Sequence, residues 1–295
     1  MRLGLHTGSI MYTNVVSDIR IARDAGYDAV EIDIPKLERY LSRGYQPEDL
    51  LPVFGSLCPA MLNSFLDIER QEPGARRAQL ERCERLCKAA WALHCPSIQV
   101  IPLNALRDEP WPEIRSKIAC SLAELADVAA TYGIRLALEP VSFASVCTLG
   151  RALEVLHAAA RENVGLCIDT FHMWTGGSPW EEVAALDPSV IVITHLSDAT
   201  PCMGREWSDA DRDVLPGDGI LPLKEAVQAI RATGYAGLWS VEVMGARHWE
   251  WDPEELAREL KRRAEAFLVG PPYGQSAVGR HRPKNRPRDD RVCQR

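Results

Sequence analysis

The chain has 295 residues, of which 46% are hydrophobic and 25% are charged. This length exceeds the roughly 100–200 residues typical of one domain but suits an α/β barrel that folds as a single unit, and the composition excludes a fibrous or largely disordered protein. The formal net charge of -7 argues against a protein that coats nucleic acid, because such affinity comes from a basic surface.

The charge is distributed unevenly along the chain. Residues 280–295 hold seven basic and two acidic residues, a net charge of +5, which leaves -12 for the preceding body. The sequence after Gly270 is rich in proline and arginine and too poor in apolar residues to form a core, so we expect a disordered basic tail over residues 269–295. Residues 1–268 are then expected to form a single domain.

Short apolar runs alternate with longer amphipathic segments throughout this domain. Because continuous apolar runs are typical of strands buried on both faces, strands are predicted at residues 3–6, 29–33, 60–65, 97–101, 135–139, 164–169, 190–195 and 238–242. Helices are predicted at residues 15–25, 76–93, 113–132, 149–160, 180–186, 223–233 and 253–267. Gly26, Gly133 and Gly234 follow three of these helices, where a left-handed residue is favoured.

This alternation predicts a (β/α)8 barrel, the TIM-barrel fold. An open doubly wound sheet is the alternative, but the first strand-to-helix turn, His6-Thr7-Gly8-Ser9, has no G-x-G-x-x-G motif. The amino-terminal sequence MRLGLHT enters a strand at once without the pattern of a secretory signal. No stretch approaches the ~18 continuous apolar residues of a membrane span. We therefore expect a cytoplasmic protein without membrane or nucleic-acid partners.

Four consecutive predicted strands end in polar residues: Glu139, Asp169, His195 and Glu242. In a barrel, the carboxyl ends of the strands meet on one rim, where the active sites of this fold lie. Three carboxylates brought together there would repel one another unless they were protonated or neutralised. Carboxylate oxygens with one imidazole suit a divalent cation such as Mn²⁺, Mg²⁺, Co²⁺ or Zn²⁺. The four residues therefore predict a site for one divalent cation.

These strand ends, together with Asp169-x-x-His172 and the later Pro216-Gly217-Asp218-Gly219, resemble the xylose isomerase-like TIM barrels, the sugar isomerase and epimerase superfamily. The resemblance spans about residues 1–268 and is greatest to the inosose (2-keto-myo-inositol) isomerases of inositol catabolism. The stretches that carry it are GYDAVEI, ARENVGLCIDTFHMWTGGS, SDADRDVLPGDGILPL and WSVEVMGARHWEWDPEE. The resemblance implies that Glu139, Asp169, His195 and Glu242 are the metal ligands.

The same resemblance implies a reaction in which the carbonyl of a polyol or ketose moves to a neighbouring carbon through an enediolate. Such a metal acts as a Lewis acid on the developing oxyanion, and a nearby carboxylate removes the carbon-bound proton. We expect Glu139 and Glu242 to be the acid/base pair as well as ligands. His172 is expected either to contact a substrate oxygen or to orient a ligand. Arg212, which the resemblance places in the loop after the seventh strand, is expected either to bind substrate or to pair with its acidic neighbours.

Further residues near the predicted rim could line a substrate pocket. His6 ends the first strand, Asn63 or Ser64 and Gln99 lie on the third and fourth strands, and Trp174 lies in the loop after the sixth. Neutral hydrogen-bonding groups with one aromatic wall suit a small polyol or ketose. A homodimer is the candidate assembly, since barrels of this type often pair through their loop faces.

Several other functions remain open on the same scaffold. A ketose 3-epimerase, a hydroxypyruvate-type isomerase and a dehydroshikimate-type dehydratase need the same metal and bases and differ only in their loops. An endonuclease IV-like hydrolase is disfavoured, because it needs histidines where this chain has Asn63, Ser64 and Gln99. The complete ligand set argues against a non-catalytic barrel. A Schiff-base aldolase is disfavoured, because no predicted strand of this chain ends in a lysine. Lys36, the nearest candidate, is expected in solvent.

Overall fold

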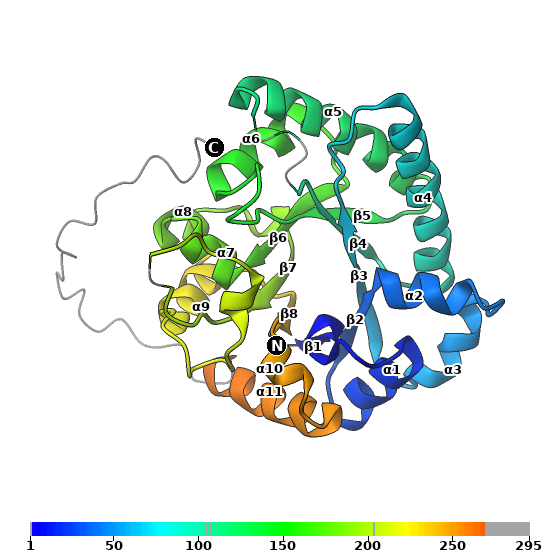
Figure 1. Cartoon of the computed structure of the whole chain (residues 1–295), viewed down its shortest axis with the longest axis vertical. Coiled ribbons are helices and arrows are strands. Elements are labelled where there is room, and N and C mark those ends of the chain that lie inside the picture. Colours follow the sequence, from blue (N-terminus) through cyan, green and yellow to red (C-terminus); the bar gives the residue numbers. More distant parts are fainter. Residues whose placement is uncertain (1, 104–105, 107, 203, 269–295) are drawn as a thin grey trace, which may run out of the picture.

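A computed structural model describes residues 2–103, 106, 108–202 and 204–268 (Figure 1). Its eight parallel strands pair in chain order, and the last pairs with the first to close a barrel. The strands are β1 (Arg2–His6), β2 (Ala29–Asp33), β3 (Cys58–Leu66), β4 (Ser97–Ile101), β5 (Arg135–Leu138), β6 (Val164–Asp169), β7 (Ile191–Leu196) and β8 (Leu238–Val241). The predicted (β/α)8 fold is confirmed. The predicted basic tail, residues 269–295, lies outside the described residues.

Helices surround the barrel and connect successive strands (Figure 1). They are α1 (Val15–Asp24), α2 (Ile34–Leu41), α3 (Leu51–Phe54), α4 (Pro73–Ala92), α5 (Trp111–Ala130), α6 (Leu149–Ala159), α7 (Thr170–Thr175), α8 (Trp180–Ala184), α9 (Leu223–Ala232), α10 (Ala246–Trp249) and α11 (Pro253–Leu268). Short 3-10 helices are η1 (Thr7–Ile10), η2 (Pro47–Leu50), η3 (Pro188–Val190) and η4 (Asp209–Arg212). No helix in the described ranges combines the length and apolar character needed to cross a bilayer.

Two of the helices that the sequence pattern did not predict begin directly at strand ends. The Asp33 side chain accepts a hydrogen bond from the Lys36 amide at 2.8 Å, and this cap starts α2. In the same way Asp169 accepts from the amides of Phe171 (2.6 Å) and His172 (3.3 Å) and starts α7. A carboxylate at this position satisfies amides that have no partner within the helix. The cap thus fixes His172 one turn from Asp169.

The apolar residues form a large core between barrel and helices and a smaller core inside the barrel. The smaller core comprises Ala29, Met61, Ala137, Cys167, Ile193 and Leu238. Because side chains alternate along a strand, Ala137, Cys167 and Ile193 point inward one layer below Glu139, Asp169 and His195. This apolar layer is the floor beneath the polar rim.

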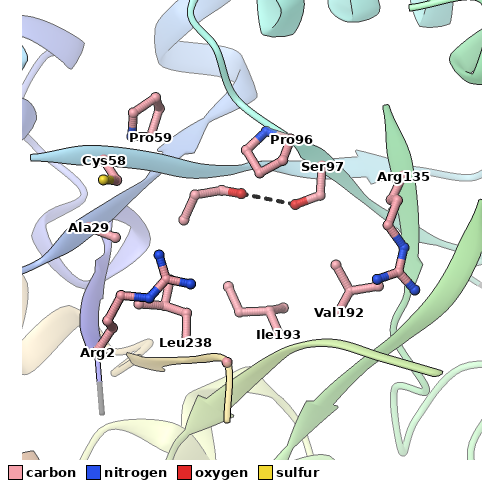
Figure 2. A pocket seen from close by; sticks show the side chains of 12 residues that line it. Arg2, Ala29, Cys58, Pro59, Pro96, Ser97, Arg135, Val192, Ile193 and Leu238 are labelled. Atoms are coloured by element: carbon pink, nitrogen blue, oxygen red, sulfur yellow. Dashed lines mark hydrogen bonds between the residues drawn. The ribbon is translucent and has the colours of Figure 1, made fainter. Parts of the chain in front are cut away.

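A cavity of about 200 Å³ lies on the side of this floor that faces away from the polar rim (Figure 2). Its lining comes from the amino-terminal parts of the strands and includes Arg2, Ser97 and Arg135. The Ser97 hydroxyl is already used, since it donates to the Ala60 carbonyl at 2.9 Å. The cavity is therefore separate from the carboxyl-terminal rim where the chemistry of this fold takes place.

Lys36 corrects one expectation from the sequence. Only 3% of this residue is exposed, and its ammonium lies 3.1 Å from the Asp18 carboxylate, which is also buried. The same group donates to the carbonyls of Thr7 (3.1 Å) and Ile10 (3.0 Å) in η1. A buried charge needs an ion partner and hydrogen bonds of this type. Lys36 thus fixes the segment that follows His6 instead of lying in solvent.

Candidate active site

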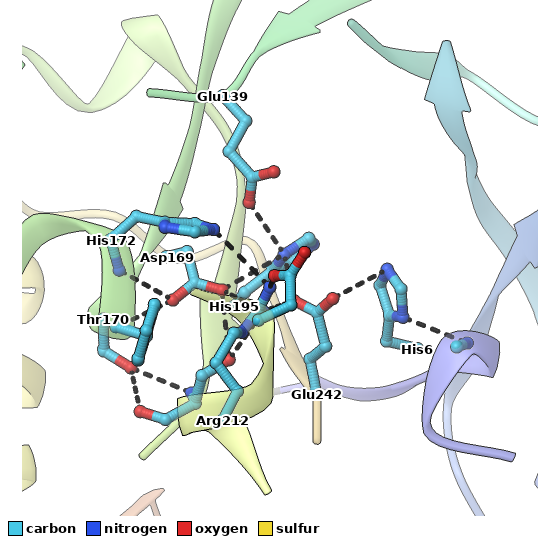
Figure 3. A network of polar contacts seen from close by, with 12 residues as sticks. His6, Glu139, Asp169, Thr170, His172, His195, Arg212 and Glu242 are labelled. Carbon is cyan, nitrogen blue, oxygen red and sulfur yellow. Dashed lines mark hydrogen bonds and ion pairs between the residues drawn. The ribbon is translucent and has the colours of Figure 1, made fainter. Parts of the chain in front are cut away.

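The four polar strand ends converge at the carboxyl rim of the barrel (Figure 3). Asp169 is the last residue of β6 and His195 lies in β7, while Glu139 and Glu242 directly follow β5 and β8. One potential ligand atom from each of the four lies within 4.8 Å of the others, and all four residues are buried. Residues that are up to 103 positions apart in the sequence therefore form one compact cluster of donors.

His195 lies at the centre of this cluster. Its Nδ1 atom is 3.0 Å from Glu242 Oε2, 3.4 Å from Glu139 Oε1 and 3.8 Å from Asp169 Oδ2. Burial disfavours the charged imidazole, but Cys167, Glu31 and Glu242 together raise the pKa of His195 well above its usual value. The cluster of acids around this ring thus strongly favours a positive charge at its centre.

Arg212 reaches the same carboxylates from η4. Its Nη2 atom donates to Asp169 Oδ2 at 2.8 Å, to Ser197 Oγ at 3.2 Å and to Glu242 Oε2. Its Nη1 atom is 3.2 Å from Asp209, so Arg212 also pairs with an acidic neighbour, as one of the two expectations had it. Arg212 is 4% exposed and lines the same cavity as Glu139 and Glu242, which leaves it within reach of a bound molecule.

The carboxylates of the cluster differ in their affinity for protons. Burial raises the pKa of Asp169 to about 7, with further upward contributions from Glu242 and Glu139 that oppose the effect of Arg212. Burial acts in the same direction on Glu242, but Arg212, His6 and His195 hold its pKa well below the usual value. Such separation of pKa values among neighbouring acids is typical of sites that use one of them as a base.

The donor set fits a divalent cation. Asp169, Glu139 and Glu242 supply oxygens and His195 supplies one nitrogen, a combination that Mn²⁺, Co²⁺ and Zn²⁺ accept in proteins. Burial raises the pKa of Asp169, and the neighbouring Glu242 and Glu139 raise it further in spite of Arg212. A divalent cation at this position would favour the ionised form of all three acids. The residues of the predicted metal site are thus chemically suited to that role.

Two histidines beside the cluster were predicted as site residues. His6 Nε2 is 3.4 Å from Glu242 Oε1, and its ring packs edge-on against His195 with centroids 5.2 Å apart. His172 is buried, and its Nε2 atom is 3.5 Å from Arg212 Nη1. Burial, followed by the charge of Arg212, lowers the pKa of His172 well below its usual value. His172 is therefore a neutral imidazole beside the cluster.

A cavity of about 190 Å³ opens onto the cluster, a volume suited to a small polar molecule. Its lining includes His6, Asn63, Gln99, His172 and Arg212, five of the residues predicted to contact substrate. Gln99 donates to Glu139 Oε2 at 3.0 Å. Asn63 donates instead to Glu31, at 2.9 Å.

Trp174 lies apart from this cavity. Its indole packs against that of Trp207, with ring centroids 5.6 Å apart, and the described residues that line the cavity do not include it. The apolar part of the lining comes from other side chains, among them Phe143, Met11 and Met244. A contact between Trp174 and substrate stays a prediction from the sequence.

Glu31 is a site residue that the sequence pattern did not single out. It is fully buried in β2, and its carboxylate lies 3.2 Å from His195 Nε2. One signal was present in the sequence: Glu31 interrupts an apolar strand, Ala29-Val30-Glu31-Ile32, at a position that points inward with Ala29. Asp33, at the end of the same strand, is the more conspicuous acid because it occupies the strand end.

An eight-stranded parallel barrel with a buried His-carboxylate cluster at its carboxyl rim defines a class of barrel enzymes suited to metal-assisted chemistry. Residues 19–266 match the family model described as "Xylose isomerase-like TIM barrel". Because this match spans most of the chain, the chain belongs to that family, and the resemblance inferred from the sequence is confirmed.

Relatives within the family are named as isomerases. The chain is 28% identical to an inosose isomerase of Halalkalibacterium halodurans over 254 residues, which cover 84% of this chain and 89% of that protein. It is 29% identical to an inosose isomerase of Bacillus velezensis over 261 residues, with 87% and 92% covered. A crystal structure described as IOLI protein with a binding zinc atom superposes with a TM-score of 0.85 at 25% identity, covering 91% and 98% of the two chains. These relatives bear out the expectation of an enzyme.

Proposed function

We propose that this protein is a divalent-metal-dependent isomerase whose substrate is an inosose, a cyclic polyol that carries one ketone. The observation that carries the proposal is the convergence of Glu139, Asp169, His195 and Glu242 in one buried cluster, beside a cavity that Glu139 and Glu242 line. The inosose isomerase relatives support the choice of substrate. The zinc atom bound in the related IOLI crystal structure supports the choice of a metal centre.

Glu139, Asp169, His195 and Glu242 would hold the cation, which when bound supplies Lewis-acid polarisation of the substrate carbonyl. The isomerisation itself moves two protons. One proton leaves the carbon next to the ketone, and a proton is added to the former carbonyl carbon. The other moves from the hydroxyl oxygen to the former carbonyl oxygen. No oxidant or reductant is consumed, so the reaction needs only groups that accept and donate protons.

Glu242 is the candidate base for the carbon-bound proton. Its pKa is held well below the usual value, with Arg212 and His6 overcoming the effect of burial, so the carboxylate is ionised at neutral pH. We propose that the proton passes from Glu242 to Glu139, exchanging with solvent on the way, and that Glu139 then donates it to the former carbonyl carbon, so that both carboxylates end the turnover as they began it. Both carboxylates line the cavity, as a base must if it is to come within hydrogen-bond reach of substrate.

His172 and Arg212 are the candidates for handling the substrate oxygens. Because its pKa is held well below the usual value, the ring of His172 stays neutral and would orient a substrate oxygen by a hydrogen bond. Arg212 carries a fixed positive charge and would orient the substrate by donating to an oxygen. The apolar floor closes the site on the side of the barrel interior.

The test is an isomerisation assay on 2-keto-myo-inositol with metal-loaded protein. Glu242→Gln keeps the shape of the side chain but cannot accept the proton, and we expect its kcat to fall at least 100-fold, as is usual for loss of an acid/base group. Glu162→Gln changes an exposed glutamate in the same way and serves as the control. Wild-type levels of turnover by Glu242→Gln would refute the assignment, and a wild-type protein inactive on inososes would refute the choice of substrate.

A further inference from the structure

Glu31 lies on the side of His195 that faces away from the other acids. Both oxygens of its carboxylate are 3.2 Å from His195 Nε2. The opposite nitrogen, Nδ1, faces Glu242, Glu139 and Asp169. The imidazole is therefore held between one acid below it and three acids above it, and its two nitrogens have different environments.

The carboxylate of Glu31 is itself held in place. The side-chain amide of Asn63, in β3, donates to Glu31 Oε2 at 2.9 Å, so a chain of hydrogen bonds runs from β3 through β2 to β7. Both residues are at most 1% exposed. Asn63 reaches the cavity, whereas Glu31 is not among the described residues that line it. Glu31 thus touches His195 and Asn63 but is not placed to touch a substrate.

A neutral imidazole has one nitrogen that donates and one that accepts, and a partner on one nitrogen decides which is which. The Cys167 thiol also lies near that nitrogen, at 3.5 Å from Nε2, but a thiol is a weak acceptor. The carboxylate of Glu31 is closer and carries a charge. It is therefore the group that can hold the proton on Nε2.

We propose that Glu31 is a positioning residue that accepts a hydrogen bond from His195 Nε2 and so directs the lone pair of Nδ1 toward Glu139, Asp169 and Glu242. This inference rests on the proposed function, because it concerns the ligand nitrogen of the proposed metal centre. Acids that bond the outer nitrogen of a ligating histidine fix the orientation of its ring and increase its basicity. Asn63 completes the arrangement by keeping Glu31 in line with Nε2.

The main variant is Glu31→Gln. Glutamine has nearly the same shape, but it has one acceptor oxygen where two donors, Asn63 Nδ2 and His195 Nε2, each need one. We expect Zn²⁺ to bind 10–100-fold more weakly than to wild type in a competition titration with a chromophoric chelator. Asp18→Asn is the matched control: it neutralises another buried carboxylate, and destabilises the fold, without touching His195. Its zinc affinity should equal that of wild type.

A second measurement separates positioning from a purely structural role. In zinc-loaded protein labelled with ¹⁵N-histidine, we expect the Nε2-bound proton of His195 to give a downfield resonance protected from exchange, and Nδ1 to carry the metal. In Glu31→Gln this proton should lose its downfield shift even in the fraction that remains zinc-loaded. Unchanged zinc affinity together with an unchanged His195 resonance would overturn the proposal.

Further measurements cover two cases: a Glu31→Gln variant that does not fold, and a wild-type protein that does not bind a metal. If Glu31→Gln fails to fold, Glu31→Asp retains the charge but withdraws it by one methylene, and zinc affinity equal to wild type in that variant would overturn the proposal. If wild-type protein binds neither Zn²⁺ nor Mn²⁺, the proposed function fails. The metal-free protein then still tests the contact, because the downfield Nε2 proton should be present in wild type and absent in Glu31→Gln.

Discussion

Replacing Lys36 by methionine removes the one charge that compensates the buried carboxylate of Asp18 while leaving a side chain of similar length. Breaking a buried pair in this way typically costs about 3–5 kcal/mol, because the remaining charge is left without a partner. The hydrogen bonds of the ammonium to Asp18, to the carbonyls of Thr7 and Ile10 and to the Thr13 hydroxyl are lost as well. We therefore expect a loss in this range in the free energy of unfolding near pH 8.

The loss should depend on pH in a definite direction. Burial raises the pKa of Asp18 from 3.8 to about 6 in spite of the attraction from Lys36. The folded state therefore binds the proton of Asp18 more tightly than the unfolded state does. The resulting contribution to stability is greatest below about pH 4 and is lost as the pH rises through about 6. This change in the pKa of Asp18 corresponds to roughly 3 kcal/mol. Without Lys36 the pKa of Asp18 rises further, so the difference between variant and wild type widens toward pH 8.

The assay is unfolding by guanidinium chloride at pH 5.5 and pH 8 for wild type, Lys36→Met and the double variant Asp18→Asn/Lys36→Met. The double variant should recover part of the stability, since it leaves no unpaired buried charge. A Lys36→Met variant that loses less than about 1 kcal/mol at pH 8, or the same amount at both pH values, would refute this reasoning. Activity should fall with stability, because Lys36 holds the segment that follows His6.

Three further predictions follow from the site and the loops around it. The pKa of Asp169 is raised to about 7 and that of His195 lies well above its usual value, so protons compete with zinc for both ligands and zinc affinity should fall by at least about tenfold for each pH unit below 7; a zinc affinity that does not change between pH 8 and pH 6 would contradict this. In Gly219→Ala, the new Cβ would lie 2.3 Å from Asp198 Oδ1 and 2.5 Å from the Ala199 carbonyl. It should lower stability by about 1–3 kcal/mol in thermal unfolding, whereas Gly74→Ala, which meets nothing within 4 Å, should not. His172→Gln should lower kcat by about 100-fold or more and leave zinc affinity within a few-fold of wild type, and a large loss of affinity would assign His172 to the metal centre instead.

Much of the fold and part of the site could be predicted from the sequence, because strands of a barrel place their last residues on one rim. Glu139, Asp169, His195 and Glu242 each interrupt an apolar run at its end, and the fold then brings them together whatever their separation along the chain. The left-handed conformation of the glycines that follow three helices could also be predicted from the sequence. Gly26, Gly133 and Gly234 have φ values of +76°, +67° and +87°, which other residues adopt only with strain.

The remaining features of the site and its surroundings depend on contacts between elements that a single sequence does not show. The burial of Lys36 follows from Asp18, which lies 18 positions earlier on another element. The role of Glu31 depends on the inward register of β2, and the pairing of β2 with β3 shifts between Val30 and Glu31. Arg212 reaches the carboxylates because η4 folds back over the rim, and its contact with Asp169 joins residues 43 positions apart. Each of these is set by packing between elements instead of by local pattern.

The central claim is that carboxylates at the rim move a carbon-bound proton of an inosose. It is tested most directly by incubating metal-loaded protein with 2-keto-myo-inositol in D₂O and following deuterium by NMR and mass spectrometry. The account predicts deuterium at the carbons that exchange the carbonyl, and none above background with Glu242→Gln. An isomerised product that stays free of deuterium over many turnovers, or no reaction by wild type, would contradict the account.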